Sequence, residues 1–280
     1  MTTIIRRRGL GYPSCQLLAK ELDGTFRTME KGQVVPYDDL YFRWGSTHSV
    51  ANKEAKVINC SRAIHRASDK RGFRLACSEI DISPSTWTHP AAVPQEAVEE
   101  GLVTRRSRHA GGKDVLVSYT YEDVIHNWES IQGDGYISKR IDKPHEYRVH
   151  IVQGRVVGVS EKHPHDKSAV AWNFHGEDGN GVFTNFKWSE WPMGVVRVAL
   201  AAHKLSRLHF GAVDVMADEA GNAYVLEINS APSLSPYRAS CYGRAFRHIR
   251  DVDNSWDTYV LTNPLECVDW RTAIHPAMRA

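Results

Sequence analysis

Three oxygen-bearing side chains lie within one short acidic segment, residues 211–229, which reads GAVDVMADEAGNAYVLEIN. Asp214 belongs to the first of two runs of strand-forming residues, and Glu227 and Asn229 end the second run. Because side chains alternate across a strand, Glu227 and Asn229 share one face. Asp214 joins that face if the two runs form a hairpin in which it lies opposite Val225, a pairing that the short turn between the runs permits.

Three hard oxygen ligands on one surface suit Mg²⁺, which prefers octahedral oxygen coordination and usually completes its shell with water and phosphate oxygens. The other face of the hairpin is apolar and is expected to belong to a core, because it carries Val213, Val215, Leu226 and Ile228. The polar face then opens into a cleft, and the pattern predicts a magnesium site. The alternative is a solvent-facing edge hairpin with incidental acidic residues.

Basic residues occur where they could act beside such a site. In the run EYRVHIV, Glu146 and Arg148 are two residues apart and share a face, and Lys162 lies on the strand expected next. A sheet face that carries arginine and lysine beside a metal would stabilise a transferring phosphoryl group. The alternative for each of these residues is an ordinary surface charge, and Lys70 in the run ASDK could be an exposed helix lysine.

The segment LVTRRSRHAGGKDVLV, residues 102–117, contains a strand, the basic residue Arg105 and a turn of small residues. Such a turn can fold over phosphates with its backbone N–H groups as donors. The spacing of a Walker A loop is absent. Without a second motif, a Gly-Gly hairpin turn explains the segment equally well.

The surrounding elements indicate a mixed α/β or α+β fold. Residues 1–60 predict a small α/β unit with a helix over 14–22 and a strand at 39–43. A helical segment is expected to begin at the capping residue Ser61 and to break at Ser83-Pro84. Further along the chain we expect antiparallel strands at 136–141 and 146–152, a third strand after the turn Gln153-Gly154, and a helix over 195–208.

Composition narrows the classes of function. The chain has 280 residues, 42% of them hydrophobic and 24% charged, with a formal net charge of +2, so net electrostatics favour neither nucleic acid nor a membrane as a partner. The five scattered cysteines predict neither a disulfide framework nor a zinc knuckle, and His163, His165 and His175 have no further ligand at zinc spacing. We expect a cytoplasmic protein without signal peptide or membrane span.

Taken in order, Lys70, the loop from Arg105 to Gly112, EYRVHIV and the DVM…LEIN hairpin resemble the ATP-grasp superfamily of carboxylate–amine ligases. The resemblance covers residues 60–235. LEIN followed by Ser-Ala-Pro-Ser is similar to D-alanine–D-alanine ligases and to RimK-type glutamate ligases, and EYRVHIVQGRVVGVSEK is closer to the RimK type. Two features depart from the family pattern: Arg105 and Arg106 stand where lysine and often proline occur, and the region before Lys70 is short.

The resemblance implies an ATP-grasp fold, with two α+β subdomains that clasp ATP after a short α/β N-terminal unit. The implied boundaries are 1–66 for that unit, 67–135 for the central subdomain with the Gly-rich loop, 136–240 for the C-terminal subdomain with the metal site, and 241–280 for a tail packed on the body. The connecting strand 136–141 would pair the adenine through its backbone.

The resemblance also implies roles for individual residues. Asp214, Glu227 and Asn229 would bind Mg²⁺, or Mn²⁺ as an alternative ion, and Arg148 and Lys162 would be the catalytic cations. The residues implied to bind ATP are Lys70, Arg105, His109, Ala110, Gly111, Gly112, Lys139, Ile141 and Glu146.

The implied reaction is ATP-dependent amide or peptide bond formation between a small-molecule carboxylate and an amine through an acyl phosphate. One alternative is a protein-modifying amino-acid ligase, for which residues 6–8 or 237–250 offer a basic or aromatic groove. A non-catalytic nucleotide-binding module is an alternative from another class. The sequence leaves the substrates open, and a dimer is only the default expectation for the oligomeric state.

Overall fold

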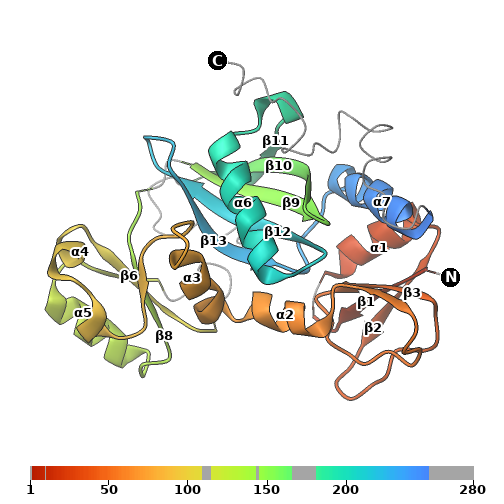
Figure 1. Ribbon diagram of the computed structural model, residues 1–280, viewed down its shortest axis with the longest axis horizontal. Helices are drawn as coiled ribbons and strands as arrows, with labels where there is room; N and C mark the ends of the chain where they lie inside the picture. The colour runs from red at the N-terminus through yellow and green to blue at the C-terminus, as the bar shows by residue number, and fades with distance from the viewer. Residues whose placement is uncertain (1, 10, 109–114, 143–144, 166–180, 252–280) are drawn as a thin grey trace.

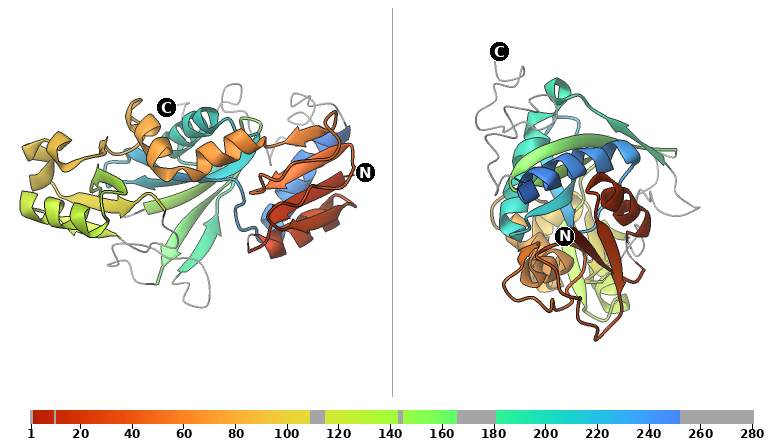
Figure 2. Two further views of the ribbon diagram at one scale, coloured as in Figure 1. Left: turned by 90° about the horizontal axis from the view of Figure 1, so that it is seen from below. Right: turned by 90° about the vertical axis from the view of Figure 1, so that its right-hand side faces the viewer.

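Three β-sheets follow one another along the long axis of the molecule, as Figure 1 and the left view of Figure 2 show. The computed structural model describes residues 2–9, 11–108, 115–142, 145–165 and 181–251. The sheets take their strands from successive parts of the chain, and helices pack on them. No helix among these residues is long and apolar enough to cross a membrane.

The first sheet is parallel and has the strand order β2-β1-β3-β4. Helix α1 packs against it, and so does helix α7 from the far end of the described chain. The rings of Phe42 in β3 and Phe246 in α7 stack with their centroids 4.1 Å apart, so α7 belongs to the core of this N-terminal unit. The elements are β1 (Thr2–Arg7), α1 (Tyr12–Glu21), β2 (Thr25–Met29), β3 (Leu40–Trp44), β4 (Lys56–Ile58) and α7 (Pro236–Asp251).

Two short helices, α2 (Ser61–Ser68) and α3 (Lys70–Ser78), replace the single helical segment expected from Ser61 onward. Asp69 separates them with non-helical backbone angles, and its side chain accepts a hydrogen bond of 3.0 Å from the backbone N–H of Gly72. Aspartate competes with helix continuation in this way because its short carboxylate satisfies the free N–H groups of a new helix. Ser61 is therefore the first helical residue rather than the cap, which is Cys60.

The second sheet has the antiparallel order β5-β8-β6-β7 and carries the Gly-rich segment between β6 and β7. Strand β8 lies in this sheet, so the expected pairing of 136–141 with 146–152 is wrong. Two apolar runs adjacent in sequence joined different sheets because each found its partners elsewhere. The elements are β5 (Thr86–Trp87), η1 (Pro90–Ala92), α4 (Gln95–Glu99), β6 (Leu102–Arg106), β7 (Leu116–Ser118), α5 (Tyr121–Ser130) and β8 (Gly135–Lys139).

The third sheet is antiparallel with the order β11-β10-β9-β12-β13, and it lies at the centre of the molecule in Figure 1. Helix α6 packs against one face, where Val149, Val213 and Val215 are buried with residues of α2 and α3. The opposite face is polar, which explains why neighbouring residues of the strands differ so sharply. The elements are β9 (His145–Val152), β10 (Arg155–Pro164), β11 (Gly181–Asn185), η2 (Trp188–Glu190), α6 (Met193–Ser206), β12 (Phe210–Ala217) and β13 (Ala223–Asn229).

The hairpin of β12 and β13 forms with a different pairing from the one expected. Asp214 lies opposite Glu227, and Val215 lies opposite Val225, so Leu226 is an extra residue on β13. This bulge shifts the alternation by one position. Val225 consequently packs in the core instead of beneath Glu227, whereas Asp214 and Glu227 still share the polar face.

Candidate active site

One row of side chains crosses all five strands of the third sheet on its polar face. Successive pairing partners place these residues next to one another: Asn185 in β11, Ser160 in β10, Arg148 in β9, Asp214 in β12 and Glu227 in β13. Directly opposed residues of neighbouring strands point to the same face. The sequence places two of these charges near the ends of strands, but only the sheet brings five strands into one row.

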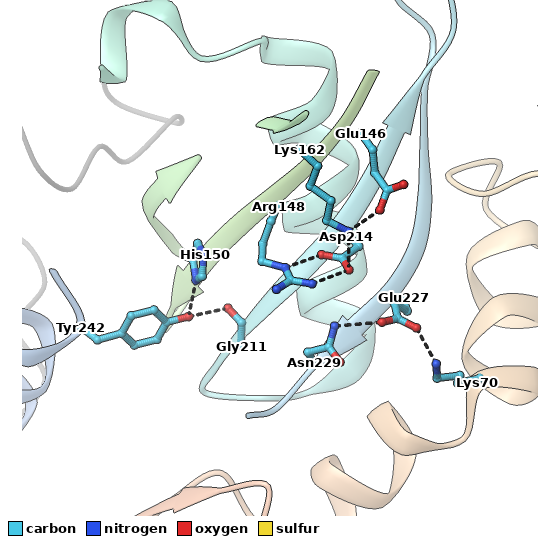
Figure 3. A network of polar contacts seen from close by, with 10 residues as sticks. All are labelled: Lys70, Glu146, Arg148, His150, Lys162, Gly211, Asp214, Glu227, Asn229 and Tyr242. Carbon is cyan, nitrogen blue, oxygen red and sulfur yellow. Dashed lines mark hydrogen bonds and ion pairs between the residues drawn. The ribbon is translucent and has the colours of Figure 1, made fainter. Parts of the chain in front are cut away.

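Asp214 is the centre of a buried ionic cluster (Figure 3). The guanidinium of Arg148 donates to both of its carboxylate oxygens, from Nε at 2.7 Å and from Nη2 at 2.9 Å. Lys162 Nζ lies 3.0 Å from Oδ2 of the same carboxylate and also pairs with Glu146. All four side chains are about 95% buried or more, and two cations and two anions balance in charge.

The fields inside this cluster keep every member charged. Burial alone would raise the pKa of Asp214, but Arg148 and Lys162 outweigh it and hold that pKa well below its ordinary value. Burial would lower the pKa values of Arg148 and Lys162, and Asp214 overrides it in both cases to raise them. A buried ion pair of this kind depends on all its partners, since removing one leaves an uncompensated charge.

Glu227 is held by a second set of contacts beside this cluster (Figure 3). Lys70 Nζ, from the first turn of α3, lies 2.6 Å from its Oε2, and Asn229 Nδ2 donates to its Oε1 over 3.1 Å. Burial would raise the pKa of Glu227, but the charge of Lys70 lowers it below the ordinary value. Lys70 is therefore a member of the site, and its position depends on the helix start that Asp69 caps.

A neutral histidine lies next to Arg148 on the same face (Figure 3). The hydroxyl of Tyr242 donates to the carbonyl oxygen of Gly211 over 3.0 Å, so its contact of 3.2 Å with Nδ1 of His150 requires that Nδ1 carries the proton. Burial, together with the charges of Arg238 and Arg148, lowers the pKa of His150 far below its ordinary value. This histidine adds no charge to the face.

A pocket of about 270 Å³ opens beside Arg148 on the side away from Glu227. Strands β9, β10 and β11 form its floor, and the segment that leads into α7 contributes its wall. The lining residues are Arg148, His150, Ser160, Phe183, Asn185, Ser233, Leu234, Ser235 and Arg238.

Sequence reasoning missed most of this pocket. Ser160 and Asn185 are ordinary polar residues in sequence, and they gain significance only as neighbours of Arg148 in the sheet. Arg238 falls within 237–250, which the sequence offered only as a possible groove for a protein acceptor. A signal was present in the Ser-Ala-Pro-Ser-Leu-Ser-Pro run after the hairpin, because such a run must turn the chain back over the polar face.

The remaining predicted residues lie on the second sheet or outside the described residues. Arg105 in β6 lies opposite Tyr136 in β8. Lys139 at the end of β8 pairs with Glu100, and Ile141 follows this strand half-buried. The loop residues His109, Ala110, Gly111 and Gly112 lie outside the described residues. Glu146, expected near a ribose, pairs with Lys162 in the buried cluster.

The residues of the expected metal site fit a divalent cation by their donor chemistry. Asp214, Glu227 and Asn229 present two carboxylates and an amide oxygen from one face, and the Asn229 amide already uses its nitrogen toward Glu227. Both carboxylates hold cationic side chains, so a metal would have to enter as these cations move to another anion. Within the described parts of the chain, no group of three or more His, Cys, Asp or Glu side chains is arranged to hold a metal.

Comparison with known proteins gives the family. A sequence model of the ATP-grasp domain, the one for family 3 of its clade, matches residues 57–249, which is more than half of the chain. The protein therefore belongs to this family of ATP-grasp domains, and both the recognised superfamily and the expected fold class are confirmed. No curated protein matches the chain.

Solved structures share the fold at low sequence identity. The ATP-grasp ligase PsnB, complexed with a minimal precursor, is 13% identical with a TM-score of 0.64, and the match covers 90% of this chain and 100% of PsnB. D-alanine–D-alanine ligase from Bacillus anthracis with ATP is 16% identical, with a TM-score of 0.60 and coverage of 94% and 98%. The macrocyclase MdnC from Microcystis aeruginosa MRC, bound with the precursor peptide MdnA, is 16% identical, with a TM-score of 0.56 and coverage of 86% and 98%.

Proposed function

We propose that this protein is an ATP- and Mg²⁺-dependent ligase that joins a carboxylate to an amine through an acyl phosphate. The observation that carries the proposal is the ionic face of the third sheet, where three cations and three carboxylates are held in balance. The cations are Lys70, Arg148 and Lys162, and the carboxylates are Glu146, Asp214 and Glu227.

A balanced ionic face suits a ligand that brings both signs of charge. Phosphate oxygens attract lysine and arginine, and a divalent cation attracts the carboxylates. When ATP enters with Mg²⁺, the pairs within the protein can be exchanged for pairs with the ligand without leaving a buried charge alone. The ionic pairs in the structure thus hold each side chain in place before the ligand arrives, which reduces the reorganisation required for binding.

Each predicted residue receives a role in this proposal. Lys70, Arg105 and the loop 109–112 hold the phosphates of ATP, and the adenosine lies near Lys139, Ile141 and Glu146. Asp214, Glu227 and Asn229 would hold the metal, which neutralises phosphate charge when bound. We further propose that ATP lies between the second and third sheets.

Arg148 and Lys162 act on the reacting groups. In the first step an oxygen of the substrate carboxylate attacks the γ-phosphorus, the bond to the β-phosphate oxygen breaks, and ADP leaves. In the second step the amine nitrogen attacks the acyl carbon, inorganic phosphate leaves with the C–O bond electrons, and the amine loses a proton. Charge accumulates on phosphoryl oxygens in both steps, and a fixed guanidinium beside them stabilises it.

The experiment is ATP-dependent phosphate release with Mg²⁺, screened against pooled amino acids, short peptides and amines, with products identified by mass spectrometry. A new mass equal to two pool members minus water supports the ligase and identifies both substrates. A product in which an added polypeptide gains an amino acid favours the protein-modifying alternative. ATP that binds only with Mg²⁺ but is not consumed with any acceptor would contradict the proposed activity.

A further inference from the structure

The pocket beside Arg148 contains a buried arginine whose contacts are all neutral. Arg238 is 4% exposed, and its guanidinium donates from Nη1 to the carbonyl oxygen of Val157 at 3.1 Å. Its Nη2 donates to Ser160 Oγ at 3.1 Å and to Asn185 Oδ1 at 2.6 Å. The buried Nε has no hydrogen-bond partner, and within the described residues no carboxylate pairs with this side chain.

This arrangement is energetically unusual. A buried cation is costly unless an anion compensates it, and the other buried cations of this face, Arg148 and Lys162, each have a carboxylate. Burial accordingly lowers the pKa of Arg238 below its ordinary value. His150 is neutral, and the charge of Arg148 is matched by Asp214, so the pocket carries an uncompensated positive charge from Arg238.

The backbone is shaped to admit this guanidinium. Gly158 lies in β10 directly beneath it, and a Cβ at this position would overlap Nη1 and Cζ of Arg238. The glycine therefore serves close approach of a side chain rather than an unusual backbone angle. An arginine admitted through a gap in a central strand, with a free donor and no counter-ion, is built to receive an anion.

The position of Arg238 in the row of side chains defines which anion. Its partner Ser160 is the strand neighbour of Arg148, and Asp214 and Glu227 follow on the next two strands. Strands lie about 4.8 Å apart, so the Ser160 end of the row is one strand from Arg148 and about 14 Å from the Glu227 end. A group bound by Arg238 thus lies beside the expected place of reaction but not in it.

We propose that Arg238, supported by Ser160 and Asn185, binds the carboxylate of an amino-acid substrate that does not react. The proposal rests on the proposed ligase function, and it makes Arg238 a specificity-determining residue. A pocket of about 270 Å³ is at the lower end of the volumes of ligand sites, which suits an amino acid. The bound carboxylate supplies the missing counter-charge and leaves the rest of the substrate directed toward Arg148.

The test compares each productive amino acid with its α-carboxamide in the Mg²⁺- and ATP-dependent phosphate-release assay, using wild type and Arg238→Gln. Hydrogen bonds to a charged group contribute about 1.5–3 kcal/mol each, so KM for the amino acid should rise about 10- to 100-fold in the variant. KM for ATP should stay unchanged. The carboxamide should be a poor substrate for wild type and equally poor for the variant.

Two further variants separate recognition from structure. Gly158→Ala keeps the charge but displaces the guanidinium, and it should raise the KM for the amino acid as Arg238→Gln does. Arg247→Gln is the matched control, since Arg247 lies on the same helix and contacts Glu21 of α1 instead of the pocket. It should behave as wild type. Equal losses for amino acid and carboxamide in Arg238→Gln would reduce Arg238 to a structural link between α7 and β10 and overturn the proposal.

A binding measurement distinguishes this proposal from the ligase proposal. If wild type consumes no ATP with any acceptor, calorimetric titration of the twenty amino acids in the presence of Mg²⁺ and a non-hydrolysable ATP analogue still applies. Binding that requires Arg238 and is weakened by the carboxamide would support the carboxylate site although the ligase reaction failed. Absence of binding for all twenty, or equal binding to wild type and Arg238→Gln, would overturn it.

Discussion

At the scale of single residues, the site consists of paired charges that hold one another in place. Asp214 is bound by two cations and Glu227 by one, so each carboxylate is ionised and fixed in orientation. Catalysis that depends on charge and position requires this kind of preorganisation. The consequences of removing a charge therefore differ between the metal-binding and the phosphoryl-binding members.

Glu227→Gln should abolish phosphate release, with a loss of about 100-fold or more in kcat, because an amide cannot supply the second anionic ligand of the metal. The fold should remain, since glutamine can still accept a hydrogen bond from Lys70. Phosphate release and circular dichroism measure the two effects. Glu219→Gln, at an exposed acidic residue in the turn of the same hairpin, is the control. Turnover retained by Glu227→Gln would remove Glu227 from the metal site.

Arg148→Ala should lower kcat by about 100- to 1000-fold while KM for ATP changes by less than about 3-fold, because its charge acts on the group in transfer. Steady-state kinetics separate these parameters. Arg197→Ala, on the exposed side of α6, is the control and should leave both unchanged. A loss confined to KM for ATP would contradict the catalytic role and place Arg148 among the nucleotide-binding residues.

At the scale of elements, helix α7 connects the two ends of the described chain. It begins shortly after the hairpin, contributes Arg238 and Tyr242 to the polar face, and buries Phe246 in the N-terminal unit. Tyr242 contacts the rings of both Trp44 and Phe210. The N-terminal unit and the site therefore share one packed core, so damage to this helix should be felt in both.

Phe246→Ala should lower the free energy of unfolding by about 3–5 kcal/mol, because it removes a fully buried ring that stacks on Phe42 and leaves a cavity. Denaturant unfolding followed by fluorescence gives this value. Val34→Ala, at a residue 57% exposed in the same unit, should stay within about 0.5 kcal/mol of wild type. Similar small effects of both substitutions would show that α7 does not stabilise the N-terminal unit.

At the scale of the whole molecule, buried neutral histidines should make stability depend on pH. Burial lowers the pKa of His203 from its ordinary 6.5 to about 3, and its Nε2 has no hydrogen-bond partner among the described residues. Between these pH values the unfolded chain binds a proton that the folded protein excludes. Acid therefore favours unfolding, and Asp214 and Glu227, whose pKa values are lowered by their cationic partners, add to the loss below pH 4.

The free energy of unfolding should accordingly fall as pH decreases from 6.5 toward 3, by up to about 1.4 kcal/mol per pH unit for each buried histidine. His203→Leu should reduce this slope by the share of one histidine. His126→Gln, at an exposed position of α5, should not change it. Urea unfolding at several pH values provides the measurement, and equal slopes in wild type and His203→Leu would refute the assignment.

The sequence by itself determined the features that depend on local spacing. The alternation in β12 and β13 placed Asp214, Glu227 and Asn229 on one face, the EYRVHIV run placed Arg148 beside Glu146, and the order of the motifs was sufficient for the ATP-grasp class. Local spacing succeeds there because strand periodicity orients each side chain regardless of what lies beyond.

Only the tertiary structure decided which strands are neighbours and what surrounds them. It paired Asp214 with Glu227 through a bulge, placed β8 in a separate sheet, and brought Lys162 onto the same carboxylate as Arg148. It also brought Arg238 from α7 over Gly158, to the end of the row that begins at Glu227. Such contacts depend on sheet order and helix packing between distant segments, and no periodicity within one segment contains that information.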